Sequence, residues 1–184
     1  MQSISIMLKS NEKMVIEQTL WFIGNIIGEN EELRDLVLRE TVLMETLQRL
    51  IEMSRIAKTL LKTAVWVNSN IARYKHLNEQ ENLICFHVAK AGIFTEDTDI
   101  ISDALWTISY LADTPDDKLI DYFSSEDVIV KIVENLDQKD LSLFVPALRC
   151  IGNILTANEP TIIERCILVG VLDKLTNLLF QSNS

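Results

Sequence analysis

The stretch Trp21-Phe-Ile-Gly-Asn25 places a large aromatic ring four residues before a polar side chain, and this arrangement returns three times. The later copies are Trp66-Val-Asn-Ser-Asn70, Trp106-Thr-Ile-Ser-Tyr110 and Arg149-Cys-Ile-Gly-Asn153, the last with a guanidinium in place of the ring. Their first positions lie 45, 40 and 43 residues apart, a period that is typical of helical repeat arrays. Because positions i and i+4 share one helix face, the copies predict a ladder of rings and polar groups.

The chain around these copies is predicted to be almost entirely α-helical. It has 184 residues with only five Gly and three Pro, and its apolar residues follow the helical period. The predicted helices span residues 3–8, 31–39, 42–53, 56–72, 81–91, 99–112, 116–124, 128–136, 141–156, 160–168 and 172–180. The polar segment 74–82 is expected to be a loop, and Pro146 is expected to kink or restart its helix. One full period thus contains three helices.

The period divides the chain into about four repeats with incomplete ends, within a single domain. The predicted boundaries give a partial repeat at 1–29, repeats at about 30–73, 74–113 and 114–157, and a partial repeat at 158–184. Repeat arrays usually finish with polar caps, and neither end of this sequence shows one. We therefore expect either a fragment or a naturally short paralogue, with possible self-association through the uncovered ends.

The charge balance favours cationic partners. With 27 acidic and 17 basic side chains, the net charge of −10 opposes nucleic-acid phosphate and anionic membranes and attracts basic polypeptides. An acidic surface that serves only solubility explains the same number equally well. The chain has no apolar run near the roughly 20 residues that a bilayer requires, and no secretory signal, so we expect an intracellular protein.

No pattern in the sequence predicts catalysis, a metal or a cofactor. Cys85, Cys150 and Cys166 form no CxxC pair, and neither histidine has metal-ligand spacing. Gly24 and Gly28 form a GxxxG step without the lysine of a phosphate loop, so close packing of adjacent helices explains them better. We predict that the protein is not an enzyme.

The four segments TLWFIGNIIGENEELRDLVL, TAVWVNSNIAR, SDALWTISYLADTPDDK and VPALRCIGNILTAN resemble the armadillo repeats of the importin-alpha family, adaptors of nuclear import. The order Trp/Asn, Trp/Asn, Trp/Tyr, Arg/Asn is also that of the family's third to sixth repeats. The resemblance covers nearly the whole chain. It implies an all-α, right-handed superhelical solenoid whose concave groove binds nuclear localisation signals, in a protein of the cytoplasm and nucleus.

The resemblance also implies roles for the repeated residues. Trp21 and Trp66 would form the walls of pockets for lysine or arginine side chains, while Asn25 and Asn70 would hold the peptide backbone. An indole face attracts a cation by about 0.5 to 2 kcal/mol, and a carboxamide offers both a donor and an acceptor. An isolated tryptophan is usually core packing, but a buried asparagine beside each ring would need a dedicated partner. The repeated pairing therefore favours a surface that faces a ligand.

Further contacts follow by position from the same resemblance. Glu29, Asp103 and Asp113 would receive cationic head groups, and Trp106 with Tyr110 forms the third row. Gln18 and Thr63 stand three residues before the first two rings, where Thr63 departs from the asparagine usual in the family. Arg149 would disfavour a basic side chain at the fourth row, and Asn153 would contact a peptide linker. These residues complete the predicted peptide-binding site.

Two departures from the family limit the prediction. The family's main binding region has three successive Trp/Asn rows and this chain has two, so its affinity for basic cargo should be lower. The sequence also lacks a basic amino-terminal segment like the one with which the family binds importin-beta. An armadillo scaffold of the catenin type, which joins proteins without binding localisation signals, is the alternative.

Overall fold

The computed structural model describes residues 1–53, 56–137 and 139–181, without the side chain of residue 181. Residues 54–55, 138 and 182–184 fall within the predicted repeats and lie outside the described residues. The described residues form the helices α1 (Gln2–Leu8), α2 (Lys13–Ile27), α3 (Glu31–Glu40), α4 (Leu43–Ile51), α5 (Lys58–Ala72), α6 (Glu79–Ile93), α7 (Thr98–Leu111), α8 (Asp117–Phe123), α9 (Glu126–Asn135), α10 (Leu141–Ile154), α11 (Pro160–Leu168) and α12 (Val171–Gln181). No strand occurs among them, which confirms the all-α prediction.

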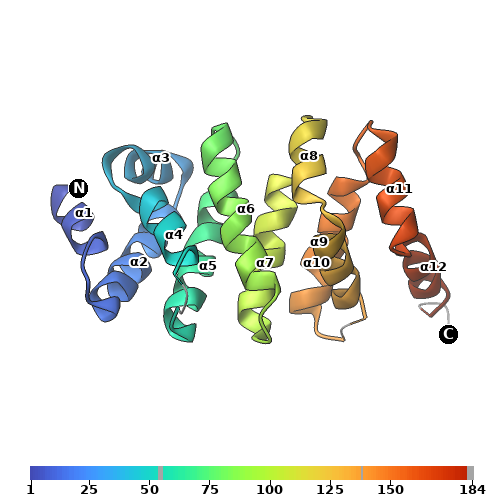
Figure 1. Cartoon of the computed structure of the whole chain (residues 1–184), viewed down its shortest axis with the longest axis horizontal. Helices are drawn as coiled ribbons and strands as arrows, with labels where there is room; N and C mark the ends of the chain where they lie inside the picture. The colour runs from blue at the N-terminus through green and yellow to red at the C-terminus, as the bar shows by residue number, and fades with distance from the viewer. Residues whose placement is uncertain (54–55, 138, 182–184) are drawn as a thin grey trace. The chain divides into compact units, whose positions relative to one another are not determined.

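The chain forms two compact units, Met1–Thr107 and Ile108–Ser184, with the boundary inside α7. In the first unit α2 packs against α5, while α1 contacts α4 and α4 contacts α6 (Figure 1). Each of these pairs joins one repeat to the next, because apolar stripes on successive helices bury one another. The core of this unit includes the fully buried Leu20, Ile23, Leu60, Val67 and Ile71.

The start of α6 is set by a capping box. The side chain of Asn78 accepts a hydrogen bond from the Glu81 amide at 2.9 Å, and the Glu81 side chain accepts one from the Asn78 amide at 2.8 Å. Both bonds satisfy amide groups that would otherwise lack a partner at the helix start. The helix therefore begins two residues before the predicted position, and the expected loop is shorter, at residues 74–78.

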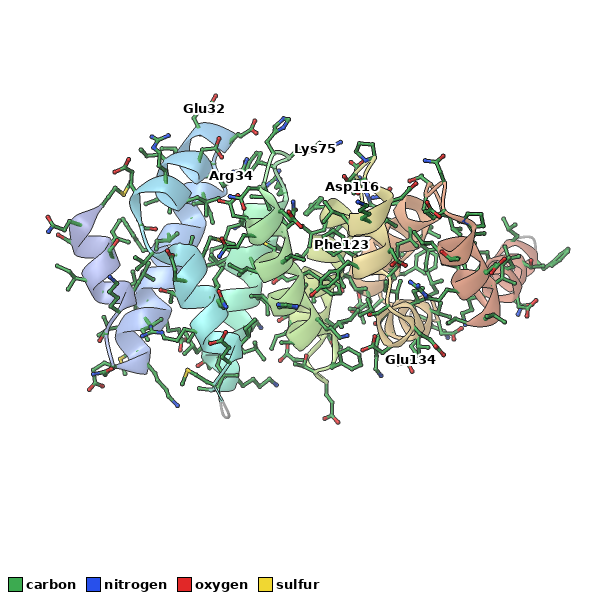
Figure 2. The ribbon with its side chains drawn as sticks, turned by 45° about the horizontal axis from the view of Figure 1, so that its top comes forward. Glu32, Arg34, Lys75, Asp116, Phe123 and Glu134 are labelled. Atoms are coloured by element: carbon green, nitrogen blue, oxygen red, sulfur yellow. The ribbon has the colours of Figure 1, made fainter. Side chains whose placement is uncertain are left out.

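Arg34 fastens this loop from α3. Its side chain is fully buried, and its guanidinium group donates to the carbonyl oxygens of Lys75 at 2.9 Å and Tyr74 at 3.3 Å (Figure 2). Asp35 and Glu31 balance its charge, with N–O distances of 2.8 and 3.3 Å. A buried arginine needs acceptors and opposite charges of this kind, and of the three guanidinium nitrogens only Nε lacks a hydrogen-bond acceptor, although it lies beside the Asp35 carboxylate. The guanidinium thus holds a loop at the place where the repeats 30–73 and 114–157 each begin with a helix, α3 and α8.

In the second unit α9 contacts both α10 and α11, and α11 contacts α12. Phe123, at the end of α8, is fully buried in this unit (Figure 2). Helix α10 runs without interruption through Pro146, so of the predicted kink or restart the restart does not occur. Pro146 lies in the second turn, where its missing N–H forgoes a single helical hydrogen bond.

Candidate functional site

The repeated rows lie on α2, α5, α7 and α10, and none of their rings is buried. The side chain of Trp21 is 58% exposed, while Trp66 and Trp106 are half-buried. Among the polar partners, Asn25 is exposed, and Asn70, Tyr110 and Asn153 are half-buried. The rings therefore keep a solvent-facing surface, as a ligand-binding role requires.

Trp66 is packed against the backbone of α2. A Cβ atom at Gly24 would lie 2.2 Å from Cζ3 and 2.7 Å from Cη2 of the Trp66 ring, which is far inside van der Waals contact. At Gly28, a Cβ atom would lie 3.4 Å from Nδ2 of Asn70. The close approach at Gly24 agrees with the prediction that these glycines serve helix packing, whereas a Cβ atom at Gly28 would make only ordinary van der Waals contact with Asn70. A residue without a side chain is needed at Gly24 so that the indole can lie across α2.

The asparagines of two rows link successive repeats. Nδ2 of Asn70 donates to the Gly24 carbonyl at 3.2 Å, and Nδ2 of Asn153 donates to the Ser109 carbonyl at 2.8 Å. In both cases the acceptor belongs to the preceding row, where it is the small residue immediately before the polar residue. The sequence analysis missed this structural role, although the small residue repeated in every copy was its signal. The amide oxygens stay on a half-exposed surface, where a ligand can donate to them.

Asn25 behaves differently from the other two asparagines. Its Nδ2 donates to the Trp21 carbonyl at 2.8 Å, one turn back in the same helix. The first row, Trp21 and Asn25, thus makes no contact in the described residues that ties its polar group to another helix. It is the most exposed of the rows.

A set of opposite charges connects α5 to the beginning of α7. Nζ of Lys62 lies 2.5 Å from Oδ2 of Asp99, and Nζ of Lys58 lies 2.9 Å from Oδ2 of Asp97. Asp103, one turn after Asp99, is half-buried, and this burial, aided by the charge of Asp99, raises its pKa from the ordinary 3.8 to about 6. Lys62 acts in the opposite direction on the pKa of Asp103. The carboxyl predicted to receive a cation is therefore neutral in part just below neutral pH.

The remaining predicted residues have simpler surroundings. Gln18, Glu29, Asp113 and Arg149 are exposed. Thr63 is half-buried, and its hydroxyl group donates to the Thr59 carbonyl in its own helix at 3.1 Å. The four exposed residues are therefore open to a ligand.

Gln18 also lines an apolar hollow on α1 and α2. The hollow has a volume of about 460 Å³ and is formed by Met7, Met14, Val15, Gln18, Thr19 and Phe22. Met14 is 75% exposed, which is unusual for a side chain of this size and polarity. Met14 and Phe22 are exposed at this hollow, so solvent reaches apolar side chains there.

The buried cysteines lie in surroundings that oppose ionisation of their thiols. Burial raises the pKa of the Cys85 and Cys150 thiols, which disfavours the reactive thiolate. No cluster of three or more potential metal ligands occurs among the described residues. None of the described helices combines the length and apolarity that crossing a bilayer demands.

No protein-family model matches the chain, but curated proteins are similar to it in sequence. Importin subunit alpha-1b of Oryza sativa subsp. japonica is 33% identical over 175 residues, covering 93% of this chain and 32% of the relative. Importin subunit alpha-2 of Caenorhabditis elegans is 30% identical over 175 residues, covering 92% of this chain and 32% of the relative. The chain therefore spans about a third of the length of these relatives.

Solved structures agree on the fold. A designed armadillo-repeat protein superposes with a TM-score of 0.80 at 19% identity, over 96% of this chain and 73% of that one. A second designed armadillo-repeat protein, solved in complex with the peptide (KR)4, gives a TM-score of 0.79 at 20% identity, with the same coverage of both chains. The chain is an armadillo-repeat protein related to importin-alpha.

Proposed function

We propose that this protein binds extended basic peptides of the nuclear localisation signal type on the Trp/Asn rows of its third helices, as a non-enzymatic import adaptor. The observation that carries the proposal is the row surface of the first unit. There the rings of Trp21 and Trp66 are exposed or half-exposed, and an asparagine lies one turn after each. An aromatic face binds the stem and charge of a lysine or arginine, and the amide binds peptide backbone.

Three further facts support this function. The relatives are importin-alpha subunits, the net charge of −10 attracts basic ligands, and the acidic Asp99 and Asp103 precede the ring of Trp106 on α7. An adaptor of this kind acts in the cytoplasm and the nucleus and catalyses no reaction. Its affinity for cargo should be modest, because the chain has two Trp/Asn rows.

The alternative is a protein-binding scaffold that does not bind localisation signals. The hydrogen bonds from Asn70 to Gly24 and from Asn153 to Ser109 favour it, because they give the repeated asparagines a structural use. Under this alternative, the apolar hollow on α1 and α2 would carry the interaction, with a second copy of the chain as one occupant.

The proposal is tested by titrating the protein into a fluorescently labelled (KR)4 peptide and measuring anisotropy at several salt concentrations. We expect saturable binding that weakens with salt, since the contacts include charge pairs. Trp21→Ala should weaken binding about 2- to 30-fold, the range that corresponds to a cation–aromatic contact of about 0.5 to 2 kcal/mol.

Phe22→Ala is the matched control. Phe22 is 49% exposed and adjoins Trp21, but it lines the apolar hollow, so its loss should leave peptide affinity unchanged. A peptide of equal length with alternating lysine and glutamate should not bind. Equal effects of the two aromatic substitutions, or equal binding of the two peptides, would refute the row surface and favour the scaffold.

A further inference from the structure

An ammonium group of the chain itself lies among the carboxylates that a basic ligand would use. Lys62 stands one turn before Trp66 on α5, and its Nζ lies 2.5 Å from Oδ2 of Asp99 on α7. Asp99 stands one turn before Asp103, which in turn precedes the ring of Trp106 by three residues. Lys62 thus stands one helical turn from an aromatic residue of one row and is paired with an acidic group that belongs to the following row.

We propose that Lys62 acts as an internal competitor that sets the affinity of the groove for basic peptides. Its ammonium group is paired with Asp99 and its positive charge offsets part of the field of Asp103, so a lysine or arginine of the ligand must displace it to gain the full attraction of these carboxylates. This inference rests on the proposed function, because it assumes that the ligand is cationic. It adds a residue that selects against weakly basic ligands.

The exposure of the pair makes the exchange feasible. The side chains of Lys62 and Asp99 are 46% and 69% exposed, so both are reachable from solvent. Exposed ion pairs are weak, because water and salt screen them and two flexible side chains must be ordered. A ligand cation that also gains an aromatic contact can therefore replace Lys62, whereas an isolated cation gains no such contact.

A second lysine provides an internal control. Lys58 lies one turn before Lys62 on the same helix and pairs with Asp97 at 2.9 Å. It carries the same charge at a greater distance from Trp66, eight positions along the helix in place of four. If position matters more than overall charge, the two lysines will differ in their effect on binding.

The experiment compares Lys62→Gln with Lys58→Gln in the (KR)4 titration at low salt and pH 7.5, where Asp103 is mostly ionised. We expect Lys62→Gln to bind about threefold to tenfold more tightly than the wild type, because one repelling charge near the ligand is gone. Lys58→Gln should change the affinity less than about twofold, since screening weakens the more distant charge. Lys62→Arg keeps the charge and should bind like the wild type.

Each outcome decides the proposal. Equal gains in both glutamine variants would mean a general charge effect and would overturn it, as would the absence of any gain in Lys62→Gln. If the wild type binds in a Trp21-dependent manner and Lys62→Gln does not bind more tightly, only this inference fails. If neither protein binds the peptide, both this inference and the proposed function fail. Circular dichroism of each variant verifies that the fold is intact.

Discussion

The row Trp66/Asn70 in the first unit and the row Arg149/Asn153 in the second share an asparagine at the second position but differ at the first position. Both asparagines donate to the carbonyl of a small residue one repeat earlier, at 3.2 Å to Gly24 and at 2.8 Å to Ser109. At the first position, Trp66 is half-buried against Gly24, whereas Arg149 is exposed. The shared asparagine stabilises the stack of repeats. The position that varies, Trp66 or Arg149, is therefore the better candidate for ligand selection.

The glycines that precede the asparagine in the first and fourth rows also differ in how tightly they are packed. Gly24 and Gly152 occupy corresponding positions, one residue before the asparagine. A Cβ atom at Gly24 would collide with the Trp66 ring, while one at Gly152 would meet nothing within 4 Å. The same residue type is thus required by packing in one row and not in the other.

The largest effect should come from Gly24→Ala. The new methyl group would displace the Trp66 ring, and overpacking of this kind costs about 1 to 3 kcal/mol in the free energy of unfolding. Urea denaturation measures the loss. Gly152→Ala should instead be neutral or stabilise by up to about 1 kcal/mol, because alanine favours helix and the space is open. Similar stabilities for the two variants would contradict the packing difference.

A smaller effect is expected at the asparagines. Asn70→Ala and Asn153→Ala should each lower the free energy of unfolding by about 1 kcal/mol, since each removes one hydrogen bond between helices. Asn25→Ala should be neutral, because its amide bonds only to its own helix at Trp21. Thermal denaturation of the three variants checks this order. A loss at Asn25 equal to that at Asn70 would show that the link to Gly24 contributes nothing.

The smallest effect concerns Asp103 and pH. Burial raises the pKa of this carboxyl to about 6, so the folded state binds its proton more tightly than the unfolded state does. The charged form therefore opposes folding above about pH 6, and the penalty disappears as the pH falls below the ordinary 3.8. Asp103→Asn should raise stability at pH 7 by less than about 1 kcal/mol after solvent screening, with no gain at pH 3.

Binding should respond to Asp103 in the opposite direction. Protonation removes a carboxylate that a cationic ligand would use, so (KR)4 affinity of the wild type should fall as the pH drops through 6, and Asp103→Asn should bind weakly throughout.

The exposed Asp113→Asn variant serves as the control for the stability measurement. A stability gain at pH 3 as large as that at pH 7 would exclude the titration of Asp103 as its cause.

Helix positions were largely predictable because apolar periodicity is a local property of the chain. The predicted segment 160–168 coincides with α11, and 56–72 differs from α5 by two residues at its start. Two differences from the predicted helices have local causes as well. The Asn78/Glu81 capping box starts α6 early, and Pro146 lies near enough to the start of α10 to be accommodated.

The candidate site was only partly predictable. The exposure of Trp21 and the half-exposure of Trp66 agree with the ladder inferred from spacing. The link from Asn70 to Gly24 and the clamp of Arg34 on Lys75 join residues about 40 positions apart, and no local pattern encodes such pairs. The pairing of Lys62 with Asp99 belongs to the same class.

By itself, the sequence determined the helices, the repeat period and the kinship with importin-alpha, because spacing along one helix sets which side chains share a face. Only the tertiary structure decided how deeply Trp66 packs, which carbonyls the asparagines hold and how Asp103 becomes hard to ionise. These properties depend on the distances between side chains of separate helices and on how far each group is removed from water. Distances and burial are both set only when the repeats stack.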